Sequence, residues 1–274
     1  MNLQEKYSSL RQSVKKLGSV VVAYSGGVDS TLLLKAAVDV LGAENVLACI
    51  ANGPALPQGQ YKAAVQVAQD IGAEIHSVTT DELADPAYSA NDPQRCFHCK
   101  SHLYRILTDI AKDRGGNCVI CGHNFDDNRD YRPGHRAAVD FGVHSPLAEA
   151  GLTKDDIRQL SRQLNLPTAD VPASPCLASR ISYGLEITPQ RLKQVEDAEE
   201  FLRRLGLVEF RVRHHETIAR IEVHPEDMKK VLSEKKRSAI VEKFKSLGFK
   251  FVTVDLQGFR SGSMNELLSE EQKD

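Results

Sequence analysis

The segment AYSGGVDST, Ala23–Thr31, places two adjacent glycines, hydroxyl side chains and one carboxylate directly after the apolar run 20–22. Glycine carries no Cβ, so Gly26 and Gly27 allow the backbone to approach a ligand closely. The backbone N–H groups of such a loop and the positive end of a following helix bind anions. The segment therefore predicts a phosphate-binding loop.

Asp29 distinguishes this loop from the common nucleotide loops. The pattern GxxxxGK[ST] is absent because the loop has no lysine, and GxGxxG is absent as well. The carboxylate of Asp29 would repel phosphate unless a divalent cation such as Mg²⁺ lay between them. Ser25 and Ser30 would add hydroxyl donors to the bound anion. The alternative is a plain tight turn in which Asp29 caps the next helix.

Strands and helices alternate around the loop. We expect buried strands over residues 19–24, 45–51, 74–80 and 117–122, and helices over 30–41, 61–71 and 100–112. This alternation predicts an α/β fold with a Rossmann-like parallel sheet and helices on both faces. Ligands of such sheets bind beyond the carboxyl ends of the strands.

The pattern changes near residue 180. Thr188 and Pro189 mark the start of a helix expected to reach Gly206. Two strands around a turn at 215–217, a helical stretch over 225–247 and a strand over 250–256 are expected to follow. The sequence thus predicts two domains, residues 1–180 with the glycine loop and a smaller α+β domain, 181–274, for substrate binding or oligomerisation.

The overall composition is ordinary for a globular chain. The 274 residues are 41% hydrophobic and 26% charged, with a formal net charge of -2. That charge gives no general attraction for nucleic acid or anionic membranes. The polar N-terminal segment resembles no secretion signal, and no apolar run is long enough to span a bilayer. We expect a cytoplasmic protein that binds neither nucleic acid nor membrane.

Four of the six cysteines form two Cys-x-x-Cys pairs, Cys96 with Cys99 and Cys118 with Cys121. The spacing of the pairs matches a zinc template. However, Cys118 and Cys121 lie in an expected strand, where residues three apart point to opposite faces. They cannot share a metal ion, so we interpret them and Cys49 as small buried hydrophobic residues.

The remaining cysteines suit a different chemistry. Cys96 and Cys99 are expected just before a helix at the ligand end of the sheet, and Cys176 lies in an aperiodic stretch with Pro172 and Pro175. Three thiolates can hold a [4Fe–4S] cluster with one iron open to an extra sulfide. The alternatives are a thioredoxin-like dithiol and inert thiols.

Longer motifs carry a family resemblance. SGGVDS (25–30) resembles the loop of the PP-loop ATP pyrophosphatases, which split ATP between the α- and β-phosphates and leave AMP on a substrate oxygen. Over essentially the whole chain, the sequence resembles the LarE family of ATP-dependent sulfur transferases. That resemblance also rests on DYRPGHRA (130–137), SPCLASR (174–180), FRVRHHETIARIE (210–222) and LQGFRSGSMN (256–265).

The resemblance implies an enzyme of nickel-pincer nucleotide cofactor synthesis. Such enzymes adenylate a carboxylate of pyridinium-3,5-biscarboxylic acid mononucleotide and replace its oxygen with sulfur, using ATP, Mg²⁺ and sulfide or another sulfur donor. It also implies a homo-oligomer, a hexamer in the family. In one branch a cysteine at the position of Cys176 gives up its own sulfur and becomes dehydroalanine. In another, cysteines at the positions of Cys96, Cys99 and Cys176 hold a [4Fe–4S] cluster. All three are present here, which favours the cluster.

The same resemblance assigns site residues. Asp29 and Cys176 are expected to be catalytic. The residues expected to bind ATP or substrate are Ala23, Ser25, Gly26, Gly27, Asp29, Ser30, Gly122, Ser179, Arg180, Arg211 and Arg213. Arg211 and Arg213 alternate along an expected strand, so both face one side and could clamp a phosphate or carboxylate. The alternative is a solvated strand face.

Weaker candidates and competing functions stay open. Asp126 and Asp127 follow a strand end and could bind Mg²⁺, or could belong to a solvated loop, and Arg132 and Arg260 are basic loop residues.

A tRNA thiolation enzyme would need a basic face, which the net charge disfavours. An ammonia-using adenylating ligase would leave the cysteines unexplained, and a nucleotide-binding sensor with a cluster would release no pyrophosphate.

Overall fold

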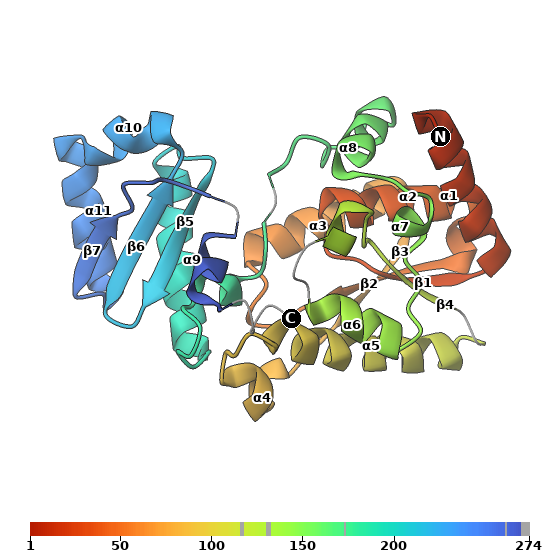
Figure 1. Cartoon of the computed structure of the whole chain (residues 1–274), viewed down its shortest axis with the longest axis horizontal. Coiled ribbons are helices and arrows are strands. Elements are labelled where there is room, and N and C mark those ends of the chain that lie inside the picture. The colour runs from red at the N-terminus through yellow and green to blue at the C-terminus, as the bar shows by residue number, and fades with distance from the viewer. Residues whose placement is uncertain (116–117, 130–132, 173, 261, 270–274) are drawn as a thin grey trace. The chain divides into compact units, whose positions relative to one another are not determined.

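The computed structural model describes residues 1–115, 118–129, 133–172, 174–260 and 262–269 (Figure 1). The chain forms two compact units. The first contains Met1–Glu82 and Cys96–Ser174, and the second contains Leu83–Arg95 and Pro175–Asp274. These units differ from the division predicted at residue 180 in the segments 83–95 and 175–180.

Asn91 explains why the segment 83–95 belongs to the second unit. Its side-chain amide donates hydrogen bonds to the carbonyl oxygens of Ser182 at 2.8 Å and Leu185 at 2.9 Å. The side chain is fully buried, so these bonds form away from water. A local sequence pattern does not predict contacts between residues about ninety positions apart.

A four-stranded parallel sheet forms the centre of the first unit. Its spatial order is β3-β2-β1-β4, and each neighbouring pair is parallel. The strands are β1 (Val20–Ala23), β2 (Val46–Ala51), β3 (Glu74–Val78) and β4 (Cys118–Cys121). This arrangement confirms the predicted α/β fold.

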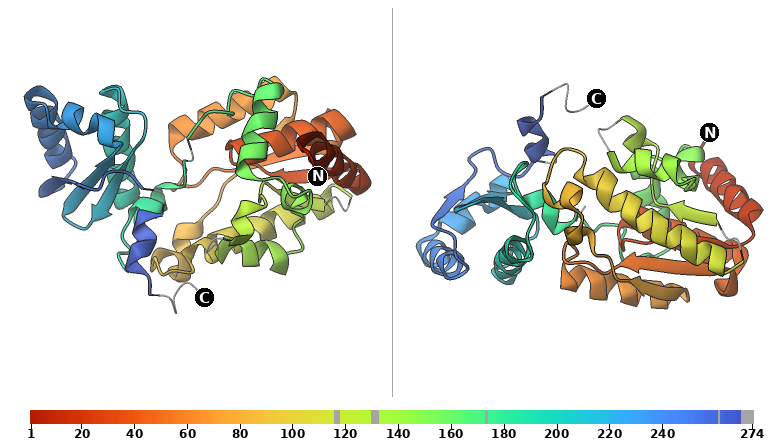
Figure 2. Two further views of the ribbon diagram at one scale, coloured as in Figure 1. Left: turned by 45° about the horizontal axis from the view of Figure 1, so that its top comes forward. Right: turned by 90° about the horizontal axis from the view of Figure 1, so that it is seen from below.

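Helices cover both faces of this sheet (Figures 1 and 2). One face packs against α1 (Leu3–Leu17), α2 (Val28–Leu41), α3 (Gln58–Ile71), α7 (Pro146–Glu149) and α8 (Lys154–Gln163). The other face packs against α5 (Arg95–Asp113) and α6 (Pro133–Asp140). In the part of the chain that the structure describes, none of the helices has the length and apolar character needed to traverse a bilayer.

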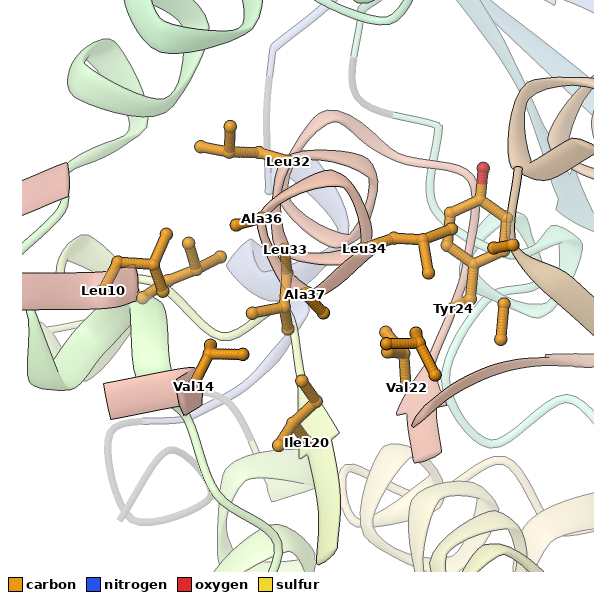
Figure 3. Packing of buried hydrophobic residues seen from close by; sticks show 14 of the residues in the cluster. Leu10, Val14, Val22, Tyr24, Leu32, Leu33, Leu34, Ala36, Ala37 and Ile120 are labelled. Atoms are coloured by element: carbon orange, nitrogen blue, oxygen red, sulfur yellow. The ribbon is translucent and has the colours of Figure 1, made fainter. Parts of the chain in front are cut away.

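The alternation of side chains along β1 produces these two cores. Val20 and Val22 point to the α2 face, while Val21 and Ala23 point to the α5 face. Figure 3 shows Val22 on the same side as the leucines and alanines of α2. Burial on both faces accounts for the continuous valine run and holds the loop after β1 in place.

The second unit is a smaller α+β structure. The antiparallel hairpin of β5 (Phe210–His215) and β6 (Ile218–Val223) is joined by β7 (Phe251–Val254), which runs parallel to β6. The helices of this unit are α4 (Pro86–Ser89), α9 (Pro189–Arg204), α10 (Met228–Leu232) and α11 (Glu234–Ser246).

Two predicted elements of this unit can be compared directly with the structure. The start of α9 is confirmed, because the Thr188 hydroxyl accepts a hydrogen bond from the Arg191 N–H at 3.2 Å. The helical stretch expected over 225–247 is present but interrupted at one residue. Ser233 has a ψ of 140°, an extended conformation that separates α10 from α11.

Candidate active site

The glycine loop connects the end of β1 to the start of α2. Gly27 occupies the N-cap position of α2, and Gly26 has a φ of 74°. A Cβ on Gly26 would lie 2.4 Å from the Cβ of Ala64 in α3, which is far too close. Gly26 is therefore required both by its left-handed backbone and by the packing of α3 against the loop.

Hydroxyl groups fix the shape of this loop. The Ser30 hydroxyl accepts a hydrogen bond from the Ser25 N–H at 3.2 Å and donates to the Gly27 carbonyl at 3.1 Å. It also lies 3.1 Å from the Ser25 hydroxyl. The loop is thus held in one conformation by its own side chains, as a preorganised anion site requires.

Gly122 brings the end of β4 against the start of α2. A Cβ at this position would lie 2.8 Å from the Ser30 nitrogen. Because β4 pairs with β1, with Cys121 opposite Ala23, the two strand ends meet beside the glycine loop. The predicted site residues Ala23, Gly122 and Ser30 therefore lie together.

The Asp29 carboxylate is held by two other segments of the first unit. The side-chain amide of Asn124, after β4, donates to one oxygen at 3.1 Å, and the ammonium of Lys154 forms an ion pair with the other. Asp29 makes no capping bond, since Gly27 is the N-cap residue and α2 has no side-chain cap. The alternative of a simple capping turn is therefore wrong.

Lys154 is a candidate that the sequence did not indicate. It lies 125 positions after Asp29, at the first position of α8, directly after the N-cap residue Thr153. The capping box of Thr153 and Asp156 signals the helix start but nothing about the loop. The fold thus places an ammonium group beside a phosphate loop that has no lysine of its own.

Asp126 and Asp127 organise the loop between β4 and α8. The Asp126 carboxylate accepts a hydrogen bond from the Lys154 backbone N–H at 2.8 Å, and Asp127 accepts one from the Asn124 N–H at 3.0 Å. Asp126 is exposed, whereas Asp127 is buried. Both carboxylates help to position the residues that contact Asp29, and their role with Mg²⁺ stays a prediction.

Cys96 and Cys99 lie inside α5, not before it as expected. The helix begins at Arg95, so both cysteines belong to its first turns. Residues three positions apart share one face of a helix. The Cys96 side chain is exposed and Cys99 is half-buried. The two thiols thus lie on one accessible helix face.

The other paired cysteines are structural. Cys118 and Cys121 lie in β4 as predicted, with Cys118 half-buried and Cys121 buried. Burial raises the pKa of the Cys49 thiol to about 12, which keeps it protonated. Cys49 and Cys121 pack in the hydrophobic core of the α5 face, and Cys118 lies at its margin.

Cys176 belongs to the second unit and has an exposed side chain. Its carbonyl oxygen accepts hydrogen bonds from the Ser179 N–H at 3.0 Å, the Ser179 hydroxyl at 2.8 Å and the Arg180 guanidinium at 3.1 Å. The backbone at Cys176 is therefore fixed while its thiol stays accessible.

Arg180, Arg211 and Arg213 are buried in the second unit. Arg180 forms an ion pair with Glu199 at 2.9 Å, and Arg213 forms one with Glu222 at 2.8 Å. The alternative of a solvated strand face is therefore wrong. Anion binding by these guanidiniums stays a prediction.

Arg211 lies in an unusual electrostatic environment. Burial, followed by repulsion from Arg180, lowers the pKa of its guanidinium to about 10. The guanidinium stacks on the ring of Phe259, with 4.8 Å from its central carbon to the ring centroid. A pKa of about 10 still leaves the group charged at neutral pH, so the charged Arg211 side chain lies near the buried ion pairs of Arg180 and Arg213.

The two other basic candidates, Arg260 and Arg132, do not belong to this buried cluster of guanidiniums. Arg260 forms an ion pair with Glu266 at 3.0 Å, and Arg132 lies outside the described residues.

Within the part of the chain that the structure describes, no three His, Cys, Asp or Glu side chains gather into a metal site. Cys96 and Cys99 belong to one compact unit and Cys176 to the other.

The parallel sheet with an SGGVDS loop between β1 and α2 defines the chain as a member of the PP-loop class of ATP-using α/β enzymes. A family model described as NAD synthase matches residues 2–101, which contain this loop. The chain is 40% identical to pyridinium-3,5-bisthiocarboxylic acid mononucleotide synthase of Lactiplantibacillus plantarum, over 98% of this chain and 97% of that protein. The chain therefore belongs to the LarE family.

Two further relatives extend over the whole chain. An uncharacterised protein of Synechocystis is 45% identical over 97% of this chain and 99% of its own. An uncharacterised protein of Methanocaldococcus jannaschii is 31% identical over 95% of both chains. The similarity thus covers both compact units and not the glycine loop alone.

Proposed function

We propose that this chain transfers sulfur to pyridinium-3,5-biscarboxylic acid mononucleotide in an ATP-dependent reaction. A carboxylate of the substrate is adenylated with release of pyrophosphate, and sulfur then replaces the activated oxygen with release of AMP. The observation that carries this proposal is the full-length similarity to the Lactiplantibacillus plantarum synthase, which includes the region of the glycine loop.

The first unit supplies the groups for adenylation. The loop Ser25–Ser30 binds the pyrophosphate of ATP through backbone N–H groups and hydroxyls. Asp29 would hold a Mg²⁺ ion whose charge would offset that of the phosphates, since a carboxylate beside phosphate needs a divalent cation between them. Lys154 then leaves Asp29 and donates to the β- or γ-phosphate, replacing the lysine that the loop lacks. Its ion pair with Asp29 supports this role.

The second unit supplies anion recognition. Arg211 and Arg213 bind the phosphate or a carboxylate of the mononucleotide, and Ser179 and Arg180 reach the same group. The gathering of three buried guanidiniums in this unit supports the assignment. Guanidinium groups suit both anions because their N–H donors match the geometry of two oxygens.

Sulfur reaches the substrate through Cys96, Cys99 and Cys176. A [4Fe–4S] cluster is the proposed carrier because three thiolates can hold one, and support comes from the exposed side chains of Cys96 and Cys176 and the helix face that Cys99 shares with Cys96. When bound, such a cluster supplies an open iron that can carry an additional sulfide. The alternative sulfur source is Cys176 alone, which would lose its thiol sulfur and become dehydroalanine.

The cysteine variants test the sulfur source. Protein prepared without oxygen should contain iron and acid-labile sulfide, and Cys96→Ser, Cys99→Ser and Cys176→Ser should each lose both. Cys118→Ser is the control, because Cys118 lies in a strand and is half-buried. Iron-free wild-type protein with dehydroalanine at position 176 after one turnover would establish the alternative source and refute the cluster.

The match to the NAD synthase model raises a second candidate, an ammonia-using adenylating ligase. That match covers only residues 2–101, whereas the similarity to the mononucleotide synthase covers both units. Supplying ammonia and sulfide in separate reactions distinguishes the two activities. An amide product would favour the ligase, and a thiocarboxylate product would favour sulfur transfer.

A further inference from the structure

Glu82 is a buried carboxylate in the first unit, at the start of a short 3₁₀ turn after β3. Its side chain is 5% exposed. Its Oε2 atom is buried, and no hydrogen-bond partner for it exists among the residues that the structure describes. Buried polar groups are nearly always hydrogen-bonded in native proteins, so this oxygen needs an explanation.

Desolvation makes a carboxylate at this position energetically unfavourable. Moving a carboxylate out of water without a donor is strongly unfavourable. A leucine or methionine of similar size would avoid that cost. A buried carboxylate oxygen that no donor of the described residues reaches is therefore expected where a ligand supplies the donor.

The backbone makes room for this carboxylate. Gly53 comes shortly after the end of β2, and a Cβ on it would lie 2.6 Å from the Oε1 atom of Glu82. The same Cβ would lie 2.5 Å from the hydroxyl oxygen of Thr80, shortly after β3. A larger residue at position 53 would displace the ends of these two polar side chains from their present positions.

This cluster and the glycine loop share one edge of the sheet. Gly53 follows β2, which pairs directly with β1 in parallel, and the loop Ser25–Ser30 follows β1. The carboxyl ends of parallel strands meet at a common edge. A nucleotide with its phosphates in the loop would therefore extend its nucleoside along the edge that carries Glu82.

A carboxylate selects a ligand that donates hydrogen bonds. The vicinal ribose hydroxyls are the donors of a nucleotide that lie closest to its phosphates. In other parallel α/β folds with a phosphate loop after the first strand, an acidic side chain further along binds the ribose hydroxyls. We propose that Glu82 accepts hydrogen bonds from the ribose hydroxyls of ATP, an inference that rests on the proposed binding of ATP at the glycine loop.

Nucleotide binding tests this proposal without the sulfur reaction. Dissociation constants are measured by calorimetry for ATP, 2′-deoxyATP and 3′-deoxyATP. Wild-type protein should bind at least one deoxy analogue about tenfold more weakly than ATP, the effect of one charge-assisted hydrogen bond. Glu82→Leu should bind ATP about tenfold more weakly and lose the discrimination, while Glu82→Gln should keep a reduced part of it.

Two controls separate recognition from folding. Glu74→Gln removes an exposed carboxylate paired with Arg114 at 2.5 Å and should leave discrimination unchanged. The melting temperature of ligand-free Glu82→Leu should equal or exceed that of the wild type, because the substitution removes a buried oxygen that has no hydrogen-bond donor among the described residues. A structural role for Glu82 would instead lower the melting temperature.

Several results would overturn the proposal. One is wild-type protein that binds ATP and both deoxy analogues equally, or binds none of them. Another is a Glu82→Leu variant that keeps full discrimination between ATP and the deoxy analogues. Intact ribose discrimination without any sulfur transfer would refute the proposed function alone and leave the role of Glu82 standing.

Discussion

Lys154→Met removes one ammonium group from the candidate active site and keeps most of the aliphatic side chain. In the ligand-free protein this group is paired with Asp29, and the two side chains are 36% and 20% exposed. Ion pairs that are accessible to water contribute only about 0.2–1 kcal/mol to stability. The free energy of unfolding should therefore fall by no more than about 1 kcal/mol.

The effect on phosphate binding should be larger. A hydrogen bond from a charged donor to a bound anion contributes about 1.5–3 kcal/mol. Its loss corresponds to an affinity for pyrophosphate that is roughly ten to a hundred times weaker. AMP carries neither the β- nor the γ-phosphate, so its affinity should not change. The substitution should thus weaken the binding of pyrophosphate and leave the binding of AMP unchanged.

Calorimetric titrations with magnesium pyrophosphate and with AMP measure both affinities. The matched control is Lys35→Met, which removes a similarly exposed ion pair, between Lys35 and Asp39 at 2.5 Å within α2. Lys154→Arg should recover part of the pyrophosphate affinity because it restores the charge. If Lys154→Met binds pyrophosphate as tightly as the wild type and the control do, Lys154 is not the cation that contacts the phosphates.

Three other predictions concern the packing around the site. Arg213→Ala removes the guanidinium from one oxygen of the fully buried Glu222, whose other oxygen keeps Arg220 at 3.1 Å and the Ser263 hydroxyl at 2.8 Å, and should lower the unfolding free energy by about 1–3 kcal/mol in denaturant titrations, with recovery in an Arg213→Met, Glu222→Leu double variant. Gly26→Ala places a Cβ 2.4 Å from that of Ala64 and should cost about 1–3 kcal/mol of stability and abolish AMP formation; wild-type values for both would contradict the packing argument. Burial lowers the pKa of His214 to about 4, so the unfolded chain binds the proton first as the pH falls. Stability should therefore decline between about pH 6.5 and pH 4, by about 2 kcal/mol at pH 5, and a His214→Gln variant with the same decline would exclude this residue as its source.

The sequence predicted the region around the glycine loop well because its signals are local. The valine run, the glycine pair and the helix that follows are contiguous, and strand–helix alternation requires the parallel sheet. The start of α5 was predicted too late because its apolar period begins only near Leu103. Asp92 is the local signal for the earlier start, since its carboxylate accepts a hydrogen bond from the Gln94 N–H at 2.8 Å just before the helix.

Contacts between distant segments could not be predicted in the same way. The ion pair of Lys154 with Asp29 depends on how α8 packs against α2, and neither helix encodes that geometry locally. The alternation of Arg211 and Arg213 correctly predicted a shared strand face, but not its burial. The buried pair of Arg213 with Glu222 forms only when the hairpin of β5 and β6 closes.

The mass of the nucleotide product tests the central claim most directly. Protein prepared without oxygen is incubated with ATP, Mg²⁺, sulfide and pyridinium-3,5-biscarboxylic acid mononucleotide, and the products are analysed by mass spectrometry. The account predicts a mononucleotide in which sulfur has replaced a carboxylate oxygen, together with AMP and pyrophosphate, and none of these products from Asp29→Ala. An unchanged mononucleotide after ATP has been consumed, or an amide in place of a thiocarboxylate, would contradict it.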